Sequence, residues 1–418
     1  MEKWQRKILF ISWLTYASFY LVRVNMSVAI PGITNEFDIS KTNIGWTLTA
    51  LFFAYAVGQF INGQIGDKFK ARKVVTIGLL ASAILNIAFG FVGNSLVLML
   101  VIWGLNGYFQ SMGWAPIVKT VSCWFSSEKR GRASGILGTS YIIGSALALV
   151  LAGFVAGQWG WRWVFFIPGI IAAISALHWL LRIKNSCEDV GFEPVEKIGD
   201  DENSQIKKYA GVKDSIVTII KDKRVWFASF SLFGLNIVRY GFLGWAPTYF
   251  FEVQHAPISS AAYKALIFPL AGAIGALSTG WFLDKISRNK QTYIISSMLL
   301  LLAIAGFFFR QIPAENWSLS LVVLGIIGFL TFGPHMAIVT FLPMSLGSKE
   351  RASSVAGFID GWGYVGAALT GVGTGFLIDN FGWNYAFYFW ISGAVIAAVL
   401  VMFLQNSSRK TKKEQQHV

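Results

Sequence analysis

Charged residues are scarce in this 418-residue chain. Asp, Glu, Lys and Arg together make up only 13% of it, against roughly 25% in a typical soluble globular protein. Hydrophobic residues account for 55%, with 35 Phe and 17 Trp, and the mean hydropathy is +0.56. This balance disfavours a water-soluble fold and predicts a molecule whose surface faces lipid.

Cysteines are few, and the usual catalytic motifs are lacking. The two cysteines, Cys123 and Cys187, are too few for a disulfide framework, and their spacing matches no metal site. The sequence contains no Walker A loop, zinc-ligand spacing or nucleophile motif. We therefore expect neither an enzyme nor an ATP-driven pump, and no metal or other cofactor.

Long apolar runs fill most of the chain. Each has about the 20 residues that a helix needs to cross a bilayer. The first contains Arg23 and is directly followed by others, so we interpret it as a helix and not as a cleaved signal peptide. The runs cover approximately residues 8–30, 43–65, 74–93, 96–124, 133–158, 162–181, 225–250, 261–283, 291–309, 317–346, 352–378 and 383–404. The predicted fold class is an all-α membrane protein with twelve transmembrane helices in two six-helix bundles.

The basic residues predict how these helices are oriented. With both termini cytoplasmic, 28 of the 35 Lys and Arg lie in cytoplasmic segments, as the positive-inside rule requires. Attraction to anionic headgroups then accounts for the net charge of +14 without any nucleic acid. We expect a multi-pass protein of a bacterial inner membrane. Its predicted parts are an N-terminal bundle (1–181), a cytoplasmic linker (182–224), a C-terminal bundle (225–404) and a basic cytoplasmic tail (405–418).

The two halves repeat each other. GQIGDKFKARK at 63–73 recurs as GWFLDKISRNK at 280–290, and GWRWVFF at 160–166 recurs as GWNYAFY at 382–388. In both halves an arginine precedes a proline at the same spacing, Arg23 before Pro31 and Arg239 before Pro247. Duplicated halves of this kind form a central site at the bundle interface near mid-membrane. One chain contains both halves, so we expect a monomer.

The paired arginines are the main candidates for substrate binding. A guanidinium near the bilayer centre costs about 2.5–3.5 kcal/mol on insertion scales, so each must face a partner or a cavity. One alternative is a structural ion pair, but Asp360 is the evident intramembrane carboxylate and would leave one arginine over. A phosphoryl dianion held between two forked guanidiniums fits better. The further substrate-binding candidates from helix position are Tyr16, Tyr20, Gln59, Asn236 and Tyr364.

Other residues are candidates for coupling and gating. Asp360 could carry a coupling proton or accept a hydrogen bond, and His335 could titrate or pack as a neutral ring. The two repeated loops are predicted to latch and release one end of the helices. Their gating candidates are Asp67, Lys68, Arg72, Asp284, Lys285 and Arg288.

The repeated GxxxDK loop resembles the signature of the major facilitator superfamily, over essentially the whole chain. YLVRVNMSVAIP, LNGYFQSMGWAPIVKTVSCWFSSEKRG, VRYGFLGWAPTYF and GFIDGWGYVGAAL resemble, more specifically, the organophosphate:phosphate antiporters. The resemblance implies that Arg23 and Arg239 bind the phosphoryl group, with Tyr16, Tyr20, Trp114 and Tyr364 near the cavity. Val24, Gln59 and Tyr141 stand where glycerol-3-phosphate transporters have a lysine, a lysine and a histidine.

The sequence leaves three mechanisms to compare. The first is exchange of an organophosphate for inorganic phosphate by alternating access, because an empty site with two unneutralised arginines resists closing. The second is a proton-coupled organic-anion symporter that uses Asp360 or His335. RVNMSVAIP also resembles the helix 1 motif of such symporters, although these generally lack the helix 7 arginine. The third is a sensor that binds sugar phosphates without transporting them.

Overall fold

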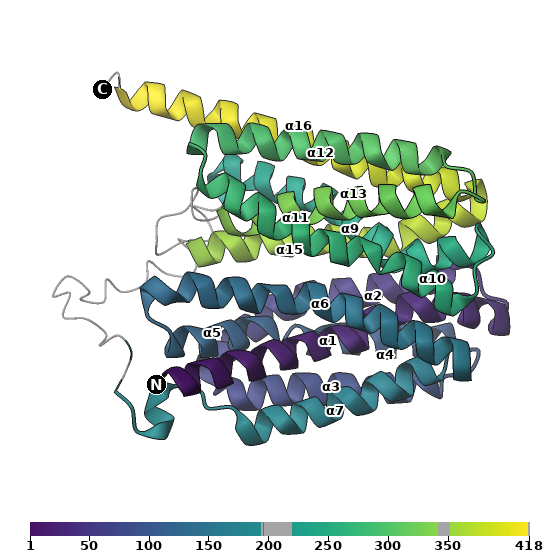
Figure 1. Cartoon of the computed structure of the whole chain (residues 1–418), viewed down its shortest axis with the longest axis horizontal. Coiled ribbons are helices and arrows are strands. Elements are labelled where there is room, and N and C mark those ends of the chain that lie inside the picture. Colours follow the sequence, from purple (N-terminus) through teal and green to yellow (C-terminus); the bar gives the residue numbers. More distant parts are fainter. Residues whose placement is uncertain (194, 196–219, 342–351, 417–418) are drawn as a thin grey trace. The chain divides into compact units, whose positions relative to one another are not determined.

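The computed structural model describes residues 1–193, 195, 220–341 and 352–416 (Figure 1). These residues are almost entirely helical. The helices of the first half are α1 (Glu2–Phe37), α2 (Lys41–Lys68), α3 (Ala71–Gly90), α4 (Leu96–Gln110), α5 (Trp114–Trp124), α6 (Ser127–Trp159), α7 (Trp163–Arg182) and the short 3-10 helix η1 (Cys187–Val190). Those of the second half are α9 (Lys223–Glu252), α10 (Ile258–Ala265), α11 (Ile267–Asp284), α12 (Arg288–Gln311), α13 (Trp317–Met336), the π-helix η2 (Ala337–Phe341), α15 (Ala352–Phe381) and α16 (Trp383–Gln416).

These elements form the twelve predicted spans, and the predicted fold class is confirmed. Within the described residues, nine helical stretches meet both the length and the hydropathy expected of a membrane span. The other three spans are α2, α9 and α15, with 28, 30 and 30 residues, which is more than the roughly 20 that a crossing needs.

Some spans are broken where the sequence suggested continuous helices. The fourth is divided into α4 and α5 around Gly113, and the eighth into α10 and α11 at Leu266. Pro116 lies in the first turn of α5, where a proline removes no hydrogen bond. The tenth span contains Pro334 and passes directly from α13 into η2. Pro334, which donates no backbone hydrogen bond, lies in the last turn of α13 just before this change.

The chain forms two compact units. The first contains residues 1–39, 50–207 and 257–263, and the second contains 40–49, 208–256 and 264–418. The first turns of α2 therefore belong to the second unit, although the rest of this helix belongs to the first. The bundle limits expected near residues 181 and 225 stay a prediction, because most of the linker lies outside the described residues.

The same contact occurs in both units at positions related by the sequence repeat. In the first unit, the indole of Trp161 donates a hydrogen bond of 2.7 Å to the Glu36 carboxylate. In the second, Trp383 donates one of 3.2 Å to Glu252. Gly160 directly precedes Trp161 and Gly382 directly precedes Trp383, and both glycines have φ of +84°. This backbone conformation favours glycine, because glycine has no Cβ. The duplicated sequence thus produces duplicated structure.

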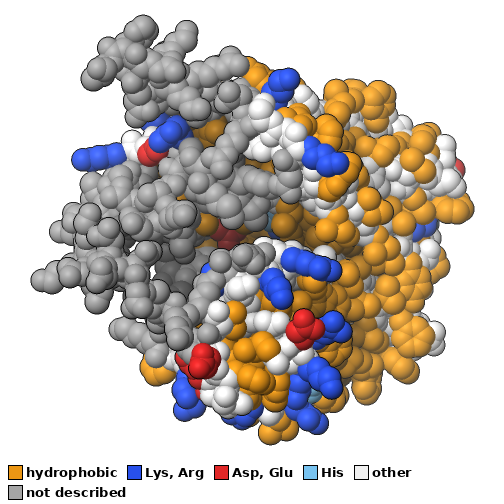
Figure 2. Space-filling model, turned by 60° about the vertical axis from the view of Figure 1, so that its left-hand side comes forward, with side chains coloured by type: hydrophobic (Ala, Val, Ile, Leu, Met, Phe, Trp, Pro, Cys, Tyr) orange, Lys and Arg blue, Asp and Glu red, His pale blue; other side chains and the backbone are white. Residues whose placement is uncertain are grey.

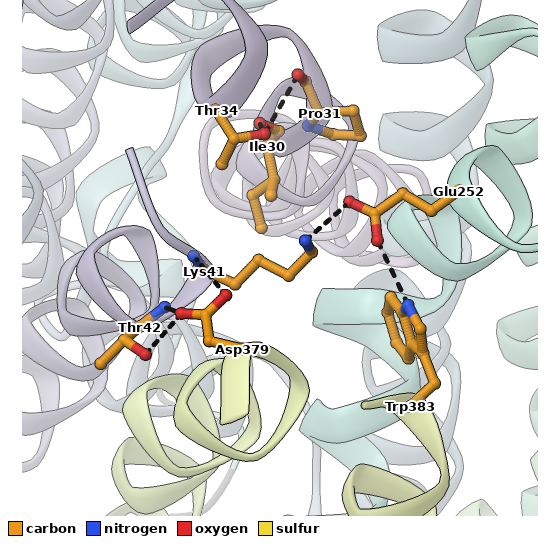
Figure 3. A network of polar contacts seen from close by, with 8 residues as sticks. All are labelled: Ile30, Pro31, Thr34, Lys41, Thr42, Glu252, Asp379 and Trp383. Atoms are coloured by element: carbon orange, nitrogen blue, oxygen red, sulfur yellow. Dashed lines mark hydrogen bonds and ion pairs between the residues drawn. The ribbon is translucent and has the colours of Figure 1, made fainter. Parts of the chain in front are cut away.

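The N-terminal end of α2 is capped twice, once by a local side chain and once by Asp379 of α15, and Figure 3 shows the second of these caps. The hydroxyl of Ser40 accepts from the backbone N–H of Asn43 at 3.2 Å. The Asp379 carboxylate accepts from the N–H groups of Lys41 and Thr42 at 3.1 and 2.7 Å, and from the Thr42 hydroxyl at 2.6 Å. Three N–H groups that a helix start leaves without intrahelical partners are therefore bonded.

Two further features attach this end of α2 to the second unit. The Lys41 ammonium lies 3.1 Å from Glu252, the same carboxylate that accepts from Trp383 (Figure 3). Gly45 on α2 and Gly371 on α15 pack so closely that a Cβ at either would be 2.5 Å from the other's carbonyl oxygen. Small residues at this crossing allow the backbones to approach.

The surface is apolar over wide areas. Large hydrophobic side chains such as Phe91, Leu181 and Val97 are 76%, 72% and 71% exposed. Figure 2 shows hydrophobic side chains covering much of the right-hand part of the face in view, while Lys and Arg lie mainly toward its centre and left. This distribution agrees with helices that face lipid along their length and carry basic residues near their ends.

Candidate functional site

A kink in α1 lies directly before Arg23. Val22 has non-helical backbone angles, φ of −102° and ψ of 21°. Its carbonyl oxygen accepts hydrogen bonds of 3.0 Å from the side-chain amides of both Asn86 on α3 and Asn106 on α4. Side chains that bond to the backbone ladder are an established cause of helix kinks. Amides from two other helices therefore support the bend that precedes Arg23.

The guanidinium of Arg23 is buried, with 4% of the residue exposed, and contacts polar and aromatic side chains of the first unit. Its Nε donates to Oε1 of Gln110 at 3.0 Å, and its Nη1 to the Tyr20 hydroxyl at 3.5 Å. The rings of Tyr20 and Tyr55 both have centroids 4.6 Å from its central carbon. At this distance the aromatic faces attract the cation. Arginine remains protonated in proteins, so this side chain keeps its positive charge.

Most of the predicted first-half candidates lie together around this arginine. The ring centroids of Tyr16 and Trp114 are 4.7 Å apart, those of Tyr16 and Tyr20 5.7 Å, and those of Tyr20 and Tyr141 6.1 Å. Gln59, one turn after Tyr55 on α2, is half-buried. Its role in the site stays a prediction.

Arg239 occupies a comparable position in the second unit, on α9, and is also 4% exposed. Its Nη1 lies 2.8 Å from Nε2 of His335 on α13. The rings of Tyr240 and Phe332 both have centroids 5.0 Å from its central carbon. A guanidinium only donates hydrogen bonds, so Nε2 of His335 must accept and the ring carries its proton on Nδ1. This Nδ1 is buried and has no hydrogen-bond partner among the residues that the structure describes.

The other second-half candidates are near this pair. The ring of Tyr364 on α15 lies 6.2 Å from that of Tyr240. Asn236, one turn before Arg239, is 1% exposed. Its amide nitrogen packs against Gly363, where an added Cβ would be only 2.8 Å away. Asp360 is half-buried on α15, and its coupling role stays a prediction. His335, proposed from the sequence for coupling, is in direct contact with the arginine.

Comparison with known proteins identifies the family of this chain. Residues 12–371 match the family model described as the Major Facilitator Superfamily. The chain belongs to this superfamily. A bacterial homologue of the human lysosomal transporter Spinster has the same fold, with a TM-score of 0.79 over 99% of this chain and 98% of its own, at 17% sequence identity. This chain is therefore a multi-pass membrane transporter and not an enzyme.

Curated relatives narrow the family further. A probable hexose phosphate transport protein of Chlamydia trachomatis is 29% identical over 99% of this chain and 94% of its own. The glycerol-3-phosphate transporter of Bacillus subtilis is 30% identical over 96% and 92%. The membrane sensor protein UhpC of Escherichia coli is 29% identical over 97% and 93%. These relatives place the transporter in the organophosphate:phosphate antiporter family.

The predicted gating residues of this transporter are described only in part. The Arg72 N–H donates to Asn185 at 3.0 Å, and its Nε to the carbonyl of Leu180 at 2.5 Å, which ties the start of α3 to the end of α7. The Lys285 ammonium lies 3.5 Å from the centre of the Trp281 ring. The side chains of Asp67, Lys68, Asp284 and Arg288 lie outside the described residues. Gating by these loops stays a prediction.

Sequence reasoning missed several residues that contact the arginines or bond the Val22 carbonyl at the kink in α1. They are Tyr55, Asn86, Asn106, Gln110, Tyr240 and Phe332. The three amides carried a usable signal, because polar side chains within apolar spans are costly unless bonded. The aromatic residues carried none, since aromatic side chains make up 16% of the chain. Within the described residues, no three His, Cys, Asp or Glu side chains gather as metal ligands would.

Proposed function

We propose that this transporter carries a sugar phosphate or glycerol phosphate across a bacterial inner membrane in exchange for inorganic phosphate. The observation that carries the proposal is the pair of buried, repeat-related arginines, Arg23 and Arg239, each of which contacts polar and aromatic side chains. The names of the relatives, which specify hexose phosphate and glycerol-3-phosphate transport, support this class of substrate.

The chemistry of the two arginines favours a phosphoryl group. A phosphate monoester carries about −1.5 to −2 charges and three acceptor oxygens. A planar guanidinium binds such oxygens through two parallel N–H bonds, which a lysine ammonium does not reproduce. One arginine donated by each repeat would balance a dianion. In this proposal Tyr16, Tyr20, Trp114 and Tyr141 line the first-half side of the site, and Asn236 and Tyr364 line the second.

Exchange follows from the cost of burying charge. A site that holds two cations without an anion would pay heavily to close away from water, whereas inorganic phosphate or an organophosphate lowers that cost. The loaded transporter therefore changes its conformation readily and the empty one does not. In this account both termini are cytoplasmic, because 28 of the 35 basic residues then lie on that side.

Exchange can be measured in proteoliposomes that contain the purified full-length transporter. We expect vesicles preloaded with inorganic phosphate to take up labelled glycerol-3-phosphate or glucose-6-phosphate much faster than unloaded vesicles. Equal uptake by loaded and unloaded vesicles would contradict exchange. Uptake that requires an inward proton gradient and no internal phosphate would show proton symport instead.

A sensing role is the second candidate, because one relative of similar identity is named a membrane sensor protein. A sensor with these arginines would bind sugar phosphates and show no flux. Binding measured on the same preparation distinguishes the two functions: transport requires both binding and exchange, and a sensor shows binding alone.

A further inference from the structure

Gln110 is bonded at both ends of its side chain. It is the last residue of α4 and is fully buried. Its Oε1 accepts from Nε of Arg23 at 3.0 Å. Its Nε2 donates to the backbone carbonyl of Phe19 at 2.9 Å and to that of Val22 at 3.4 Å. The guanidinium can only donate and the carbonyls can only accept, so this amide orientation is the one that satisfies all three partners.

The three bonds connect the backbone of α1 to the head group of its arginine. The Val22 carbonyl, at the kink, accepts from Gln110 as well as from Asn86 and Asn106. Gln110 differs from the two asparagines because it alone among these amides also contacts the Arg23 guanidinium. It therefore couples the bend of the helix to the direction of the arginine.

The bond to Nε limits how the guanidinium can turn. With Nε directed at Gln110 and the rings of Tyr20 and Tyr55 each 4.6 Å from the central carbon, both the plane of the group and its rotation within that plane are restrained. A restrained fork loses less entropy when it binds an oxyanion, and its Nη1 and Nη2 then meet the oxygens in one geometry.

We propose that Gln110 is a positioning residue for the substrate: it orients Arg23 so that the Nη1–Nη2 edge engages the phosphoryl group. This inference rests on the proposed function, in which Arg23 binds phosphate. Gln110 acts through the arginine, and its uncharged amide suits this role. A carboxylate at the same place would accept from Nε equally well, but it would also neutralise the cation and compete with the anionic substrate.

The experiment compares three variants of the full-length transporter: Gln110→Met, Gln110→Glu and Asn106→Leu. Met is close to Gln in size but lacks its amide. Asn106→Leu is the matched control, because Asn106 also lies on α4 and also bonds the Val22 carbonyl. Binding of inorganic phosphate and of glycerol-3-phosphate is measured by titration calorimetry in detergent. The thermal midpoint of each variant is measured in parallel, so that a loss of folded protein is separated from a loss of affinity.

We expect Gln110→Met to weaken the binding of both probes about 10-fold, as loss of a hydrogen bond to a charged group should. Gln110→Glu should weaken it more, by about 100-fold, because a carboxylate competes with phosphate for Arg23. Asn106→Leu should lower the thermal midpoint as much as Gln110→Met does and leave the affinity of the folded protein nearly unchanged.

Two results would overturn the inference. If wild type binds phosphate and Gln110→Met loses no more affinity than Asn106→Leu, Gln110 is only structural. The same conclusion follows if Gln110→Glu binds as tightly as wild type. If wild type binds neither probe, the proposed function fails, and this inference fails with it. If wild type binds phosphate and only the variants depart from expectation, the inference fails alone, so the two failures are distinguishable.

Discussion

At the scale of single residues, the two arginines are held by different chemistry. Arg23 is held through Nε by an amide, and Arg239 through Nη1 by an imidazole. Both partners are neutral acceptors, so neither cancels the positive charge. The repeat relates the arginines, and their partners come from the equivalent fourth and tenth spans, but the partner is the amide of Gln110 on α4 in one half and the imidazole of His335 on α13 in the other. The duplicated halves have therefore diverged in how they restrain the same side chain.

His335 is expected to matter chiefly as an acceptor for Arg239. His335→Leu removes the acceptor and leaves a buried donor of the guanidinium with one bond fewer, so phosphate affinity should fall about 10-fold. His335→Gln offers an amide oxygen in its place and should keep most of the affinity. Titration of both variants with inorganic phosphate checks this. If Gln at this position is as damaging as Leu, the acceptor role is wrong.

The burial of the two arginines could be predicted from the sequence, because their position within apolar spans and their charge were enough. A guanidinium within an apolar span has to be buried against polar groups, and both are 4% exposed. Their partners could not be assigned in advance. The contact between Arg23 and Gln110 joins residues 87 apart, and it depends on how α1, α2 and α4 pack.

At the scale of elements, the bend of α1 shows why local sequence rules give incomplete predictions. Proline is the usual marker of a kink, and α1 contains Pro31. The non-helical residue is instead Val22, well before that proline. Three amides from α3 and α4 bond its carbonyl. Tertiary hydrogen bonds, which the sequence of α1 alone does not contain, thus determine where the helix bends.

The start of α2 provides a prediction at this scale. Asp379→Ala removes the acceptor for two N–H groups of the first turn, at a cost of about 1 kcal/mol for a lost helix cap. We expect faster hydrogen exchange at residues 41 and 42, with less change at Asn43, which Ser40 still caps. Hydrogen exchange measured by mass spectrometry or NMR tests this.

Asp379→Asn is the matched control, because an amide oxygen can still accept from the same N–H groups. Its exchange rates should lie between those of wild type and Asp379→Ala. Unchanged exchange in the Ala variant would mean that the carboxylate does not stabilise this helix end.

At the scale of the whole molecule, the duplication is the feature that the sequence predicted best. The repeat relates Glu36 to Glu252 and Trp161 to Trp383, and each unit contains the corresponding hydrogen bond. Twelve spans followed from apolar length alone, since a helix needs about 20 residues to cross the bilayer. The breaks in the fourth, eighth and tenth spans did not follow from it, because the length of an apolar run does not indicate where a helix is interrupted.

The central claim is that one arginine from each repeat binds one shared phosphoryl group. The most direct measurement is calorimetric titration of inorganic phosphate into wild type, Arg23→Gln and Arg239→Gln, with all three confirmed as folded by their thermal midpoints. The account predicts one phosphate bound per chain in wild type and loss of that same site in either variant. The reason is that each guanidinium donates half of the N–H bonds that hold the phosphoryl group. Two independent sites in wild type, of which each variant loses one, would contradict it.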